Sequence, residues 1–159
     1  MRVTIVCAGK LKEKYLTQGI AEYEKRLAPF CSLEIREIHE ERMPAEPSEA
    51  EKAQVLAREG ERLLRQVPQG SYLFVLDVFG DEMSSEEFSA RLDRLALQGK
   101  SSLTFLIGGA FGLSEAVRAA ADRRLSFSRF TFTHQMVRLL LVEQIYRAMK
   151  ISRGEKYHW

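Results

Sequence analysis

One segment of the sequence, residues 103–114 (LTFLIGGAFGLS), restricts the possible folds more than any other. Its first five residues form an apolar run that predicts a buried strand. The glycines that follow predict a tight turn before a helix capped by Ser114. Such a turn brings bare backbone close to a ligand, although it also suits a close packing corner between a strand and a helix. The segment lies in the last third of the chain, whereas dinucleotide-binding folds carry their glycine fingerprint after the first strand.

The rest of the chain alternates between strand and helix patterns, which predicts a mostly parallel α/β sheet with helices on both faces, in a single domain over residues 1–159. Two capping-box patterns, Ser48 with Glu51 and Ser84 with Glu87, mark helix starts. The first helix is expected to bury Tyr15, Ile20, Tyr23 and Leu27, and residues 79–83 to form a turn. Strands are predicted at 2–8, 33–38, 72–78 and 103–107, helices at 12–27, 48–66, 84–98, 114–123 and 135–151, and a strand or a structured loop at 125–133.

Composition excludes several classes of protein. With 45% hydrophobic and 29% charged residues, the 159-residue chain is neither disordered nor fibrous. It shows no membrane-spanning segment and no signal peptide at its start, so we expect a cytoplasmic protein. Cys7 and Cys31 lack the spacing of metal ligands, and no metal site is predicted.

Charge is distributed unevenly along the chain. Residues 115–159 contain nine basic and four acidic residues, a net charge of +5, whereas residues 1–114 carry −3. The asymmetry fits a surface for a polyanion, but charge alone favours solvated helix faces as the explanation.

Two further segments carry side chains suited to ligand binding. Residues 125–133 interleave hydroxyls with three phenylalanines, as a nucleoside site or an edge strand would. The C-terminus ends in Tyr157, His158 and Trp159, whereas chain ends usually favour polar residues. These aromatic groups fit either a nearby site or a tail packed on the surface.

Taken together, these motifs resemble a known family. The matching segments are GKLKEKY at 9–15, AEYEKRL at 21–27, LIGG at 106–109, GL at 112–113, LSFS at 125–128, TFTH at 131–134, VR at 137–138, EQIYRA at 143–148 and YH at 157–158. In this combination they are similar to the ribosomal large-subunit pseudouridine N3-methyltransferases, the H-type, short-chain members of the SPOUT class. The resemblance covers essentially the full length of the chain.

The resemblance implies a SPOUT-type sheet with a C-terminal trefoil knot, a homodimer, and S-adenosylmethionine (S-adenosyl-L-methionine) as the methyl donor. It also implies methylation of N3 of the pseudouridine at position 1915, in the usual rRNA numbering, of 23S rRNA within assembled ribosomes. Two departures from the family pattern are Thr133, in place of proline, and the terminal Trp159, in place of a basic residue. Carried over by position, the cofactor contacts are Leu76, Gly108, Phe127, Ser128, Arg129, Phe130, Thr131 and Phe132.

Tyr157 and His158 are the candidates for orienting the target base, and Arg138 for a phosphate or anion contact. A structural ion pair with a nearby acid, on the same helix or on the partner subunit, is the alternative for Arg138. Two other functions remain open for the whole chain. One is a ribosome-binding module that has kept the fold without catalysis, and the other is a SPOUT enzyme that acts on tRNA.

Overall fold

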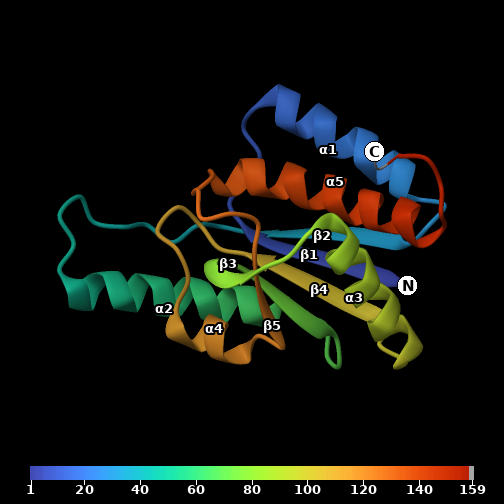
Figure 1. Cartoon of the computed structure of the whole chain (residues 1–159). Helices are drawn as coiled ribbons and strands as arrows, with labels where there is room; N and C mark the ends of the chain where they lie inside the picture. Colours follow the sequence, from blue (N-terminus) through green and yellow to red (C-terminus); the bar gives the residue numbers. More distant parts are fainter. Residues whose placement is uncertain (158–159) are drawn as a thin grey trace.

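A computed structural model describes residues 1–157 of the chain. Its core is a five-stranded sheet with the order β2-β1-β4-β3-β5, in which every pair of neighbouring strands is parallel (Figure 1). The parallel α/β architecture predicted from the sequence is therefore confirmed. The strands are β1 (Arg2–Ala8), β2 (Ser32–Ile38), β3 (Tyr72–Glu82), β4 (Ser102–Ile107) and β5 (Arg123–Ser126).

Helices cover both faces of the sheet, as the connections between parallel strands require. On one face α5 lies between α1 and α3, and on the other face α2 packs against α4 (Figure 1). Each start and end lies close to the position that the sequence predicts. The helices are α1 (Lys14–Leu27), α2 (Glu49–Arg65), α3 (Ser85–Leu97), α4 (Glu115–Ala120) and α5 (His134–Ser152).

Alternate residues of the central strands belong to two hydrophobic cores, one on each face of the sheet. In β1, Val3, Ile5 and Cys7 join the core beneath α1, α3 and α5, whereas Val6 and Ala8 join the core beneath α2 and α4. The strand is buried on both faces, because side chains alternate across a covered sheet. In the first core the rings of neighbouring strands meet: Phe74 of β3 and Phe105 of β4 stack with their centroids 4.8 Å apart.

Both predicted capping boxes are present. Ser48 caps α2 and Ser84 caps α3, and each serine hydroxyl accepts the backbone N–H of the glutamate three residues later. The glutamate side chains, Glu51 and Glu87, accept the serine N–H groups in return. These local signals explain why the sequence located the two helices so closely.

Two predictions about local structure are wrong. Helix α1 begins at Lys14, two residues later than predicted, and Tyr15 is 60% exposed because Leu16 takes the inward position. Residues 79–82 belong to β3 rather than to a turn. Strand β3 leaves its pairing with β5 after Leu76 and resumes it at Asp81, so residues 77–80 form a bulge. Gly80, the last residue of this bulge, produced the turn signal.

The segment at 125–133 combines the two structures that the sequence left open. Strand β5 ends at Ser126, and residues 127–133 form the loop that leads into α5. In the described part of the chain, no helix is both long and apolar enough to cross a membrane. The trefoil knot stays a prediction.

Thr133 caps α5 in this chain, because its Oγ1 accepts the backbone N–H of Met136 at 3.3 Å. We expect Thr133→Ala to lower the free energy of unfolding by about 1 kcal/mol, since it leaves that N–H without its side-chain partner. Thr133→Ser keeps the hydroxyl and serves as the control, with a stability close to that of the wild type. Urea unfolding followed by circular dichroism measures both, and equal stability of the alanine and serine variants would contradict the capping role.

Candidate cofactor and active site

A cavity of about 350 Å³ opens at the carboxyl ends of β3, β4 and β5. In parallel α/β sheets this is the edge at which ligands bind. Three segments far apart in the sequence form its walls: the bulge of β3, the glycine turn after β4, and the loop after β5. Seven of the eight predicted cofactor residues line it, namely Leu76, Gly108, Phe127, Ser128, Phe130, Thr131 and Phe132. The eighth, Arg129, is exposed and does not line it.

The glycine turn is packed so closely that position 108 has no space for a side chain. A Cβ on Gly108 would lie 2.6 Å from Leu113 Cδ2 and 2.9 Å from the carbonyl oxygen of Gly112. The turn is closed by a hydrogen bond from the N–H of Gly112 to the carbonyl of Gly109, 3.2 Å long. Bare backbone at Gly108 therefore forms part of the cavity wall.

Hydroxyl groups fix the loop after β5. The Ser126 hydroxyl donates to the carbonyl oxygen of Ser128 at 3.0 Å, and the Ser128 hydroxyl accepts the N–H of Phe130 at 3.0 Å. These local bonds hold the backbone in a turn, as serine side chains commonly do. The loop presents its phenylalanines to the cavity from this turn.

Glu59 of α2 supports the glycine turn from behind. Its buried carboxylate accepts the N–H groups of Gly109 and Glu41, each at 3.3 Å. Burial outweighs these hydrogen bonds and raises the pKa of Glu59 above 4.5. The ionised form is therefore disfavoured in the folded state.

Because the pKa of Glu59 is raised on folding, the stabilisation from its protonation is present at low pH and is lost as the pH rises through the folded-state pKa. We expect the free energy of unfolding of the wild type, relative to Glu59→Gln, to fall as the pH rises above about 4.5. Urea titrations in a series of buffers from acidic to neutral pH measure it. Glu61→Gln, at an exposed position of the same helix, is the control for the general effect of replacing a glutamate by glutamine there. A pH-independent difference for Glu59→Gln would contradict this account.

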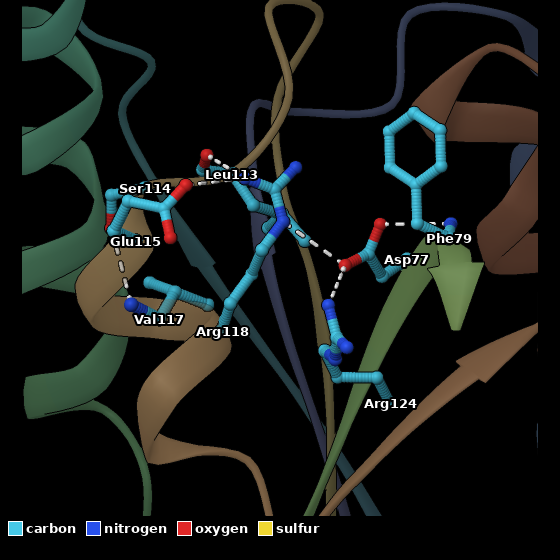
Figure 2. Close-up of polar contacts among 8 residues, drawn as sticks. All are labelled: Asp77, Phe79, Leu113, Ser114, Glu115, Val117, Arg118 and Arg124. Carbon is cyan, nitrogen blue, oxygen red and sulfur yellow. Dashed lines mark hydrogen bonds and ion pairs between the residues drawn. The ribbon is translucent and has the colours of Figure 1, made fainter. Parts of the chain in front are cut away.

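Asp77 is a buried residue of the cavity that the sequence analysis did not single out. It contacts Arg118 and Arg124 from two other elements, and it accepts the backbone N–H of Phe79 (Figure 2). The signal was visible in the sequence, because Asp77 is the one charged residue in the apolar run of residues 72–79. A charge in a strand buried on both faces needs partners, and such partners often mark a site.

The rim of the cavity is unusually apolar for an exposed surface. Phe79 is 77% exposed, Phe111 56% and Phe130 80%, and each comes from a different wall. Exposed apolar groups gathered at one opening are typical of a binding surface rather than of ordinary solvent-facing structure.

Arg138 does not line this cavity in the chain. It is fully buried at the start of α5, where one guanidinium nitrogen lies 3.0 Å from Glu37 and another donates to the carbonyl oxygen of Gly9 at 3.0 Å. This arrangement favours the structural ion pair over contact with a phosphate, and the acid comes from β2 rather than from α5 itself.

Tyr157 also lies away from the cavity of its own chain. Its hydroxyl is 3.2 Å from that of Tyr23 and donates to Glu143 at 3.1 Å, and its ring meets Tyr146 edge-on. Burial and these neighbours raise the pKa of Tyr157, which favours its protonated form. The predicted site residue His158 falls outside the described residues.

Neither a histidine nor a cysteine lines the cavity among residues 1–157. No group of three or more potential metal ligands occurs anywhere in that range. The described lining is mostly apolar, with hydroxyl groups and the Asp77–Arg118 ion pair as its polar part. It does not offer an imidazole or thiolate as a proton acceptor.

Comparison with known proteins identifies the protein family of this chain. A family model described as "Predicted SPOUT methyltransferase" matches residues 1–158. The chain therefore belongs to the SPOUT methyltransferase family. It is 52% identical over 158 residues to the ribosomal RNA large subunit methyltransferase H of Listeria monocytogenes (serovar 1/2a, strain ATCC BAA-679 / EGD-e), covering 99% of each chain. It is 50% identical over 158 residues to the protein of the same name from Halothermothrix orenii, again over 99% of each chain.

Solved structures share the fold at much lower sequence identity. The tRNA (m1G37) methyltransferase of Aquifex aeolicus matches with a TM-score of 0.54 at 12% identity, over 92% of this chain and 69% of that one. A probable methylase family protein from Haemophilus influenzae Rd KW20 matches with a TM-score of 0.52 at 11% identity, over 99% of this chain and 70% of that one. At these identities the likeness concerns the fold alone.

Proposed function

We propose that this chain, acting as a single domain, transfers a methyl group from S-adenosylmethionine to N3 of a pseudouridine in 23S rRNA, the one at position 1915 that the family resemblance implies. One observation carries the proposal most directly. Seven residues assigned to the cofactor by family resemblance come from three distant segments, and all seven line one cavity at the carboxyl edge of the sheet. Relatives about half identical over their full length are named as rRNA methyltransferases.

The residues that line the cavity suit an adenosyl ligand. Gly108 lines the cavity without a side chain, so its backbone is available there to a flat ring. Phe127 and Phe132 add apolar surface, and the hydroxyl of Ser128 adds a polar group. When bound, S-adenosylmethionine supplies an electrophilic methyl group on a sulfonium. The residues of the chain hold that ligand and align it with the acceptor, since displacement requires an in-line approach.

The exposed phenylalanines support a nucleic-acid substrate. A target base has to leave its stack before N3 is accessible, and aromatic side chains receive unstacked bases. Phe79, Phe111 and Phe130 offer such faces at the rim, and Arg129 offers a charge beside them for phosphate. The net charge of only +2 favours a structured target, the assembled ribosome in the cytoplasm, over free RNA.

We also propose that the chain works as a homodimer. Helix α5 keeps several apolar side chains half-exposed, among them Met136, Leu139 and Leu140, which a second copy would cover. The placement of Tyr157 and Arg138 away from the cavity of their own chain is consistent with a site that one copy does not complete. Light scattering at micromolar protein tests the proposal, and a monomeric mass would contradict it.

The deciding experiment is mass spectrometry of nucleosides from a strain that lacks the gene. We expect 3-methylpseudouridine to disappear from its 23S rRNA, and the purified protein with S-adenosylmethionine to restore it on isolated ribosomes. Loss of a methylated nucleoside from tRNA instead would favour the SPOUT enzyme that acts on tRNA. An unchanged nucleoside profile would favour the ribosome-binding module.

A further inference from the structure

Asp77 lies where two walls of the cavity meet, and the proposed methyl transfer assigns it no role. The residue is only 5% exposed. One carboxylate oxygen, Oδ1, accepts the N–H of Phe79 at 3.1 Å. The other, Oδ2, lies 3.0 Å from Arg118 Nε and 3.4 Å from Arg124 Nη1 (Figure 2). A single buried carboxylate therefore joins the bulge of β3, helix α4 and strand β5.

The bond to Phe79 fixes the bulge that forms the first wall. Residues 77–80 leave the β3–β5 ladder between two positions that both pair with Leu125. The bulge presses against the neighbouring strand, because a Cβ on Gly80 would lie only 2.7 Å from the carbonyl carbon of Arg124. Asp77 holds the first turn of this bulge, from which Phe79 projects.

Arg118 extends the connection to the second wall. Besides its contact with Asp77, its Nη1 donates to the carbonyl oxygen of Leu113 at 3.1 Å (Figure 2). Leu113 is the residue whose side chain closes over Gly108 in the glycine turn. The path from Asp77 through Arg118 to Leu113 therefore consists of two charge-assisted hydrogen bonds, which are stronger and more directional than neutral ones.

We propose that Asp77 is a positioning residue that fixes the β3 bulge relative to the glycine turn and thereby sets the affinity of the cavity for its cofactor. The inference rests on the proposed S-adenosylmethionine site. Pre-organised walls matter here, because a cavity that has to be ordered on binding loses affinity by the cost of that ordering.

Calorimetric titration with S-adenosylmethionine tests the role. We expect Asp77→Asn to weaken binding about tenfold or more, since the amide keeps the size of the side chain but loses the charge-assisted contact. The matched control is Asp81→Asn, which breaks the ion pair of an exposed aspartate with Arg123 at the other end of the bulge. It should bind within about twofold of the wild type.

A double-mutant cycle separates positioning from a general loss of stability. If Asp77 acts through Arg118, the Asp77→Asn/Arg118→Gln double variant will bind no more weakly than the weaker single variant. Circular dichroism and thermal unfolding confirm that each variant is folded at the titration temperature. Wild-type affinity in Asp77→Asn, or additive losses in the cycle, would overturn the inference. Absence of binding by the wild type would instead overturn the proposed function.

Discussion

Replacing Gly108 with a bulky residue is expected to abolish cofactor binding while leaving the sheet folded, the largest functional effect we expect from a single substitution. The added Cβ would lie 2.6 Å from Leu113 Cδ2 and 2.9 Å from a backbone oxygen, so the glycine turn has to move. Overpacking of this kind typically costs about 1–3 kcal/mol, and every 1.4 kcal/mol is roughly a tenfold change in affinity. We expect Gly108→Ala to weaken S-adenosylmethionine binding at least about tenfold and Gly108→Val to remove it.

A destabilised variant with an intact cavity is the control for Gly108. Ile20→Val removes one methyl group from the core beneath α1 and costs about 1 kcal/mol, far in sequence from the three walls. It should bind the cofactor like the wild type. Binding by Gly108→Val with wild-type affinity would show that the glycine turn is a packing corner and not a ligand wall.

Removing Arg138 has the largest expected effect on stability. Its guanidinium is buried, contacts Glu37 and donates to the carbonyl oxygen of Gly9. Arg138→Ala therefore leaves that carbonyl oxygen without its hydrogen-bond donor and creates a cavity at the start of α5. Breaking a buried pair by removing one partner costs roughly 3–5 kcal/mol. Because Glu37 is partly exposed, we expect about 3 kcal/mol from urea unfolding, at the low end of that range.

An exposed pair provides the comparison for Arg138. Arg26→Ala breaks the ion pair with Glu22 on the surface of α1, and its urea midpoint should stay close to that of the wild type. One result would favour a role for Arg138 in substrate contact instead of in stability. If Arg138→Ala unfolds at the wild-type urea concentration and yet loses methyl transfer, the arginine acts on the substrate and not on the fold.

The sequence predicted those parts of the fold whose signals are local. Serine and glutamate three residues apart located α2 and α3, and mostly apolar runs located β1 and β4. The order of the strands is set by contacts between distant segments, and no local pattern encodes it. The bulge in β3 was missed for a related reason. A glycine pressed against a neighbouring strand looks the same in the sequence as a glycine in a turn.

The candidate site, too, was predicted where the sequence carries a motif and missed where a residue's role depends on distant partners. Glycines and phenylalanines that line the cavity stood out as motifs, and resemblance to a family grouped them before any geometry was known. Asp77 was missed because its role depends on arginines that follow it by more than 40 residues. Arg138 and Tyr157 carry side chains typical of catalysis. Each has a partner from an element more than 100 residues earlier in the chain, Glu37 for Arg138 and Tyr23 for Tyr157.

The central claim is that the cavity between the β3 bulge, the glycine turn and the loop after β5 binds S-adenosylmethionine. Calorimetric titration of the wild-type protein tests it most directly. We predict saturable heat with one cofactor bound per chain, and loss of that heat in Gly108→Val. No saturable heat at sub-millimolar protein would contradict the claim and leave the chain a methyltransferase fold without its methyl donor.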